Sequence, residues 1–152
     1  MIATGITADG HREVLGVDIG DSEDETFWTR FLRSLKKRGL SGVRLVTSDA
    51  HDGLKAAIRR CLQGSSWQRC RVHYIRNLLA VIPKAHTEMV AAVFRSIFTQ
   101  ATPEEVHARW DEVTDTLDGH GFTKAAASMR EAKPDVLAFT MNRPGSGGGS
   151  DP

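Results

Sequence analysis

A short apolar segment that ends at an acid and continues into a helix constrains this 152-residue chain more than any other feature. Residues 43–47 read Val-Arg-Leu-Val-Thr, which has the β-branched and aliphatic character of a buried strand in a parallel sheet. Residues 48–53 turn the chain, and residues 54–62 follow with apolar side chains at helical spacing. This order predicts an α/β fold.

Asp49 follows the predicted strand directly and lies at its carboxyl end. Open α/β sheets bind their ligands at the carboxyl ends of parallel strands, so Asp49 is the first candidate for chemistry. A simpler interpretation is that Asp49 or Asp52 caps the helix that follows. The segment alone is compatible with both.

A second motif lies about twenty residues further on, where Cys70-Arg71-Val72-His73 joins a predicted strand, Ser66–Cys70, to a predicted helix, Val72–Ile82. Three arginines and two aromatic residues surround it. They are Arg69, Arg71, Arg76, Trp67 and Tyr74. Such a mixture suits phosphate contact and base stacking, which makes the arginines candidate DNA contacts. The alternative is an ordinary solvated helix face.

Three sequence stretches together point to a family: GITADGHREVLGVDIGDSEDETFW, SDAHDGL and WQRCRVHYIRNLL. In this order they resemble the bacterial insertion-sequence transposases of the Mutator type, over residues 2–139. The resemblance implies an RNase H-like catalytic domain in which two aspartates and a glutamate (DDE) hold divalent metal. It assigns Asp49 as the second aspartate, a catalytic residue and metal ligand. Cys70 and His73 match a family motif and are expected beside the active site without binding metal.

The same resemblance implies DNA as partner, in the form of transposon terminal repeats, and magnesium as the metal for strand cleavage and transfer. It places the other two catalytic acids outside this sequence, because neither Asp9 nor Asp18 matches the first position. We therefore expect a chain truncated at both ends and inactive alone. The alternatives are a non-catalytic module that binds DNA or associates with itself or intact transposase, and a gene remnant without function.

The amino-terminal region predicts a β-hairpin, Ile2–Ile19, with Asp9-Gly10 in its turn. A helix follows and ends at Gly39, and Ser22 with Glu25 has the spacing of a capping box at its start. The acids of residues 21–25 are explained by the dipole of this helix, so they are not interpreted as a metal site.

From Lys84 onward the sequence predicts only helices, at residues 85–100, 102–117 and 122–132, the last closed by Pro134. The expected organisation is a partial RNase H-like mixed sheet with flanking helices in residues 1–82 and an all-helical insertion in 83–139. A glycine- and serine-rich tail in 140–152 is expected to be disordered.

The net charge and the number of cysteines bear on DNA binding, on cellular location and on zinc binding. Twenty basic and nineteen acidic residues give a formal net charge of +1, so DNA binding requires local basic patches. Two cysteines, with no apparent leader or membrane segment, predict a cytoplasmic protein. Cys61, Cys70 and His73 suggest zinc, but a fourth ligand at a usual spacing is missing, so structural zinc is not expected.

Overall fold

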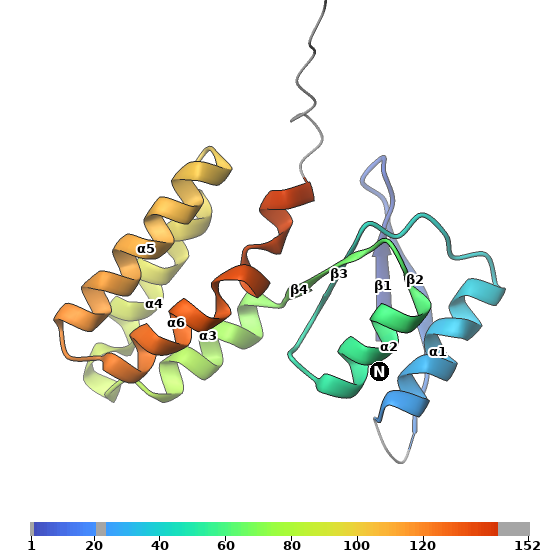
Figure 1. The fold of residues 1–152 in the computed structure, drawn as a ribbon, viewed down its shortest axis with the longest axis horizontal. Coiled ribbons are helices and arrows are strands. Elements are labelled where there is room, and N and C mark those ends of the chain that lie inside the picture. The colour runs from blue at the N-terminus through green and yellow to red at the C-terminus, as the bar shows by residue number, and fades with distance from the viewer. Residues whose placement is uncertain (1, 21–23, 143–152) are drawn as a thin grey trace, which may run out of the picture. The chain divides into compact units, whose positions relative to one another are not determined.

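The computed structural model describes residues 2–20 and 24–142 (Figure 1). The chain forms two compact units: the first comprises residues 1–46 and 50–67, and the second comprises residues 47–49 and 68–152. Helices and strands occur together, so the predicted α/β character is confirmed.

The first unit begins with the predicted hairpin, in which β1 (Ile2–Ile6) pairs antiparallel with β2 (Arg12–Val17). Gly10 adopts φ 88° in the turn, a left-handed conformation that glycine adopts at little cost. Ala3 and Leu15 pack against the apolar core of this unit. The hairpin therefore uses one face to cover the helices of its own unit.

Helix α1 (Glu25–Lys37) contributes half of the buried residues of that core. The buried residues are Phe27, Trp28, Phe31, Leu32 and Leu35. The helix begins after Asp24, whose carboxylate accepts a hydrogen bond from the Phe27 nitrogen at 2.9 Å. The predicted Ser22–Glu25 capping box is therefore wrong, because Asp24 occupies the cap position; Ser22 itself lies outside the described residues. Gly39, with φ 113°, follows the helix end as predicted.

Helix α2 (Asp52–Cys61) packs against α1, as Figure 1 shows. Gly53 permits the close approach, since a Cβ atom there would lie 2.8 Å from the backbone nitrogen of Glu25. Leu54, Ala57, Ile58 and Cys61 are buried on the face that the apolar spacing predicts.

Strands β3 (Leu45–Ser48) and β4 (Ser66–Arg69) form a second pair. The Ser66 nitrogen donates to the Arg44 oxygen at 2.8 Å, and the Cys70 nitrogen donates to the Ser48 oxygen at 2.6 Å. Residue numbers rise together on the two strands from the first of these bonds to the second, so the strands run parallel. Within the described residues the strands form two separate two-stranded sheets instead of the single mixed sheet expected.

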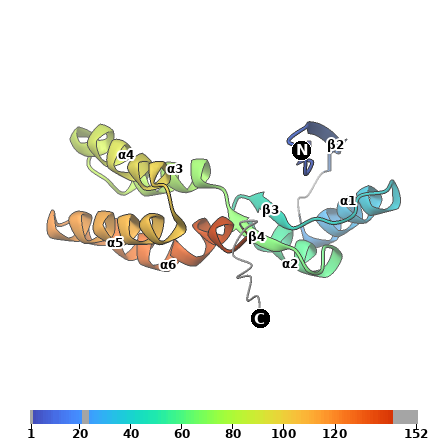
Figure 2. The ribbon, with the colours of Figure 1, turned by 90° about the horizontal axis from the view of Figure 1, so that it is seen from above.

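The second unit is built mainly from α3 (Arg71–Ala80), α4 (Thr87–Ser96), α5 (Pro103–Gly119) and α6 (Thr123–Val136). Each helix contacts the next, and α3 also contacts α6, which closes a four-helix arrangement (Figure 2). Short 3-10 helices flank them: η1 (Lys84–His86), η2 (Ile97–Thr99) and η3 (Ala138–Asn142). The predicted capping box of Thr102 and Glu105 is confirmed.

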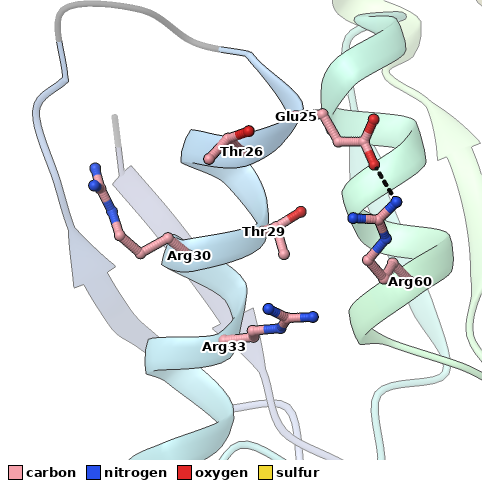
Figure 3. Close-up of a pocket in the computed structure, with 6 residues that line it drawn as sticks. All are labelled: Glu25, Thr26, Thr29, Arg30, Arg33 and Arg60. Carbon is pink, nitrogen blue, oxygen red and sulfur yellow. Dashed lines mark ion pairs between the residues drawn. The ribbon is translucent and has the colours of Figure 1, made fainter.

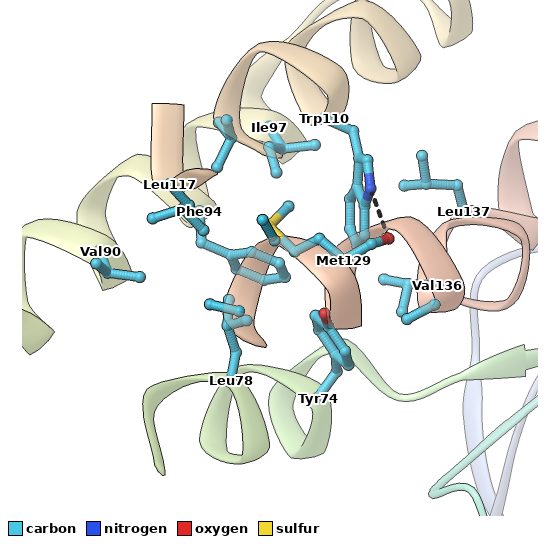
Figure 4. Packing of buried hydrophobic residues seen from close by; sticks show 14 of the residues in the cluster. Tyr74, Leu78, Val90, Phe94, Ile97, Trp110, Leu117, Met129, Val136 and Leu137 are labelled. Atoms are coloured by element: carbon cyan, nitrogen blue, oxygen red, sulfur yellow. Dashed lines mark hydrogen bonds between the residues drawn. The ribbon is translucent and has the colours of Figure 1, made fainter. Parts of the chain in front are cut away.

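A cluster of buried apolar side chains, with the aromatic rings of Tyr74, Phe94 and Trp110 among them, fills the space between these helices (Figure 4). Trp110 is fully buried, and its indole nitrogen donates to the Met129 backbone oxygen at 3.0 Å. The rings of Tyr74 and Phe94 lie 6.0 Å and 5.8 Å from that of Trp110. Helix α3 therefore belongs to the helical core, and the units divide near β4, whereas a boundary at residue 83 was expected.

The carboxyl-terminal helix differs from the prediction, because α6 continues through Pro134 to Val136. Val136 and Leu137 are fully buried, so packing outweighs the local preference of proline for ending a helix. Thr140, assigned to the disordered tail, lies in η3, and its hydroxyl lies 3.0 Å from His107 Nε2. Residues 143–152 lie outside the described part of the chain.

Two methionines in the second unit provide a matched test of this core. Met129 in α6 is 0% exposed, whereas Met89 in α4 is 44% exposed. We expect Met129→Ala to lower the free energy of unfolding by about 2–5 kcal/mol, because it leaves a cavity. Met89→Ala should change it by less than about 1 kcal/mol. Urea unfolding of both variants measures this, and equal losses would contradict the packing described.

Candidate functional site

Asp49 is the residue directly after β3, and its side chain is exposed. The alternative role as a helix cap is wrong. The N-cap of α2 is His51, whose Nδ1 accepts a hydrogen bond from the Leu54 nitrogen at 3.3 Å, and Asp52 is the first residue of the helix. The carboxylate of Asp49 is thus not used to begin α2, and it stands at the carboxyl end of a parallel strand pair, where ligands bind in α/β sheets.

Cys70 lies at the same edge, because its backbone nitrogen bonds to the residue before Asp49. It is the N-cap of α3 and is partly exposed, with no hydrogen bond from its side chain to the helix. His73 follows in the first turn of α3 and is exposed. The backbone therefore places Asp49 and Cys70 directly after neighbouring strands. In the described residues, no hydrogen bond links the side chains of Asp49, Cys70 and His73 to one another.

The metal-binding possibilities are limited. In residues 2–20 and 24–142, no three histidine, cysteine or acidic side chains gather closely enough to hold a metal ion. Cys61 belongs to the first core, where its Sγ donates to the backbone carbonyl oxygen of Thr29 at 3.8 Å. In the acid cluster before α1, Asp24 caps the helix and Glu25 pairs with Arg60, while residues 21–23 lie outside the described part.

Two of the three candidate arginines lie over aromatic rings of the second unit. The Arg69 guanidinium carbon is 4.9 Å from the centre of the Tyr74 ring, and that of Arg71 is 4.6 Å from the centre of the Phe98 ring. Cation–π contacts of this kind restrict a long side chain without neutralising its charge. Arg76 is exposed on α3, on the same side as His73 three residues earlier.

The two aromatic residues proposed for base stacking are placed differently. Tyr74 is fully buried, and its hydroxyl lies 3.0 Å from Ser128 Oγ, so its expected stacking role is wrong. Trp67 is partly buried in the first unit, and Lys55 Nζ lies 4.5 Å from the centre of its ring. No sequence pattern indicated Lys55, because its contact with Trp67 forms only when Trp67 packs against the core that α1 and α2 share.

Comparison with known proteins gives the family. A model described as "Transposase, Mutator family" matches residues 1–145. The chain belongs to the Mutator family of transposases. It is 46% identical over 140 residues to a transposase for insertion sequence element IS1081 from Mycobacterium tuberculosis, a match that covers 92% of this chain and 34% of the relative. A transposase for IS256 in transposon Tn4001 from Staphylococcus aureus is 40% identical, covering 92% and 36%.

The resemblance recognised in the sequence motifs is therefore confirmed at the level of family. This Mutator-family chain spans about a third of the length of the curated relatives it matches. Among the helices that the structure describes, none combines the length and apolar character needed to cross a membrane.

Tyr74 is the single tyrosine, which makes its environment directly measurable. Burial raises its pKa above the ordinary value of 10.0, and the Ser128 hydrogen bond and the charge of Arg69 oppose this more weakly. As pH rises past 10, the unfolded chain releases the phenolic proton while the folded chain retains it. The contribution of Tyr74 to stability is thus complete below pH 10 and is lost as pH rises through the folded-state pKa.

We expect the ultraviolet absorbance of tyrosinate to appear at higher pH in the folded protein than in urea. The variant Tyr74→Phe should lack this absorbance change. It should also lose less stability above pH 10, because it has no phenolic proton to release. Equal titration midpoints in folded and unfolded protein would contradict the burial of Tyr74.

Proposed function

We propose that this chain is the part of a Mutator-family transposase catalytic domain that supplies one active-site carboxylate, Asp49, and a DNA-binding surface beside it. The observation that carries this proposal is the position of Asp49, exposed at the carboxyl end of the parallel pair β3–β4 and not used as a helix cap. Asp49 and Cys70 follow neighbouring strands and so lie at the same edge of the pair β3–β4. In an RNase H-like sheet, the catalytic acids would lie at this edge.

The DNA-binding surface is proposed to consist of Arg69, Arg71 and Arg76. All three belong to the second unit and lie at the end of β4 or on α3. Two guanidinium groups are oriented by aromatic rings, and arginine donors match phosphate oxygens in pairs. These contacts would position the DNA backbone, whereas reading of terminal-repeat bases requires contacts in the grooves.

Transposases cleave DNA and transfer strands, and the metal expected from the resemblance is magnesium. Magnesium requires several oxygen ligands, of which protein carboxylates usually supply one or two together with substrate phosphates. The described residues provide Asp49 without a cluster of three possible ligands, so they do not by themselves fit a two-metal catalytic site. We assign no catalytic step to metal in this chain and propose that Cys70 and His73 support the strand ends.

A second candidate is a non-catalytic module that binds DNA, or pairs with itself or with an intact relative, and thereby alters transposition. The single candidate carboxylate and the local group of arginines favour it over a gene remnant without function. Addition of the chain to an assay of an intact relative distinguishes the two, because a binding module changes the rate and a remnant does not.

Binding can be tested through the salt dependence of DNA affinity, measured by fluorescence anisotropy. Arg76→Gln should weaken binding several-fold on any sequence and reduce the slope of log affinity against log salt by about one, since one phosphate contact is lost. The control is Arg130→Gln, which removes the same charge from α6, outside the proposed surface of β4 and α3. Identical behaviour of the two variants would contradict a role for α3.

Activity can be tested separately with supercoiled and terminal-repeat DNA in magnesium or manganese. We expect the purified chain neither to nick nor to join DNA, because one carboxylate does not hold two metal ions. Metal-dependent nicking that disappears in Asp49→Asn would show that other acids of this chain complete the site.

A further inference from the structure

A hollow between α1 and α2 in the first unit places arginine side chains near a buried hydroxyl that has no hydrogen-bond partner in the described residues (Figure 3). Its volume is about 460 Å³. The lining residues are Glu25, Thr26, Thr29, Arg30, Arg33 and Arg60. All of them belong to the first unit, and only Arg60 comes from α2.

The hydroxyl of Thr29 is the unusual group. Thr29 is only 6% exposed, and its Oγ1 is the buried side-chain polar atom that lacks a hydrogen-bond partner in the described part of the chain. A helical threonine ordinarily donates to the carbonyl four residues earlier, as Thr114 does to Trp110 at 2.8 Å. The Thr29 hydroxyl instead points toward α2 (Figure 3). A buried hydroxyl without a partner destabilises the free protein.

The charges around this hydroxyl are mainly positive. The guanidinium groups of Arg33 and Arg60 lie between the two helices, and the carboxylate among the lining residues is that of Glu25, which lies 2.9 Å from Arg60 Nη2 (Figure 3). The side chains of Arg60 and Glu25 are 58% and 41% exposed, so the pair is weak and easily exchanged. The Arg30 side chain extends away from α2, and its guanidinium lies 5.9 Å from the centre of the Phe27 ring. Arg33 extends on the same side of α1 as Thr29 and has no carboxylate partner in the described residues (Figure 3).

The lining of the hollow identifies the chemistry of its ligand. Guanidinium groups and hydroxyls are all hydrogen-bond donors to an anion, and planar guanidinium groups match the oxygens of a phosphate. None of the described residues that line the hollow carries an aromatic ring on which a base would stack. The arrangement therefore suits a phosphate group and not a nucleobase.

We propose that this hollow binds a backbone phosphate of DNA, with Arg33, Arg60 and the Thr29 hydroxyl donating to its oxygens. The phosphate takes the place of Glu25 beside Arg60 and supplies the missing partner of Thr29. This site rests on the proposed DNA binding of the chain and adds a contact on the first unit to the arginines of the second.

The test measures DNA affinity of the full chain against salt for Arg33→Gln and Arg60→Gln. Each should weaken binding several-fold and reduce the salt slope by about one. The matched control is Arg59→Gln, an exposed arginine of the same helix that does not line the hollow. Glu25→Gln should strengthen binding, because it releases Arg60.

Thr29 gives a readout that a purely structural residue would not give. Thr29→Val removes the unpartnered hydroxyl at nearly constant volume, so it should raise the Tm by about 2–8 °C while weakening DNA binding several-fold. Thr29→Ser, which keeps a hydroxyl, should restore the affinity. Loss of stability and affinity together in Thr29→Val would overturn the site.

Different results would overturn the DNA binding of the chain and the phosphate site in the hollow. A wild-type chain that binds no DNA overturns both the proposed function and this site. Wild-type binding that is unchanged in Arg33→Gln and Thr29→Val overturns this site alone. An equal loss in Arg59→Gln overturns it as well, since that result would reflect total charge and not the hollow.

Discussion

The hydrogen bond from the Cys70 nitrogen to the Ser48 oxygen is the contact on which the candidate site depends. It aligns the ends of β3 and β4, so that Asp49 and the start of α3 emerge at one edge. A two-stranded pair is marginal alone and needs packing on other elements. Val46 and Trp67 contact the apolar core of the first unit, and within the second unit Gln68 Oε1 accepts from the Phe139 nitrogen at 2.7 Å.

Aromatic residues of the second unit pack in its apolar core and also contact arginine side chains. Tyr74 belongs to the buried core, yet the face of its ring also receives Arg69, and Phe98 receives Arg71 in the same way. Ordering a long side chain in the free protein reduces the entropy lost when it binds. The helical core therefore supports the proposed DNA-binding surface directly, because the same rings stabilise the fold and orient the guanidinium groups.

Positive charge in this protein is local. The formal net charge is only +1, and in the described residues three arginines are paired with acids: Arg60 with Glu25, Arg109 with Glu112 and Arg130 with Asp118. Arg33 and Arg76 have no such carboxylate partner in the described residues, and Arg69 and Arg71 are paired with rings instead. A nearly neutral chain can therefore present separate basic surfaces to a polyanion, with a low general attraction to other acidic molecules.

The sequence by itself determined the features that depend on neighbouring residues. The Thr102–Glu105 capping box, the hairpin turn at Asp9-Gly10 and the apolar face of α1 formed as predicted, and the family motifs identified the Mutator family. Tertiary packing decided the rest. His51 caps α2, α6 continues through Pro134 because Val136 and Leu137 are buried, and Tyr74 is withdrawn into the core. The hollow beside Thr29 could not be read from the sequence, because Arg33 and Arg60 meet only when α1 and α2 pack together.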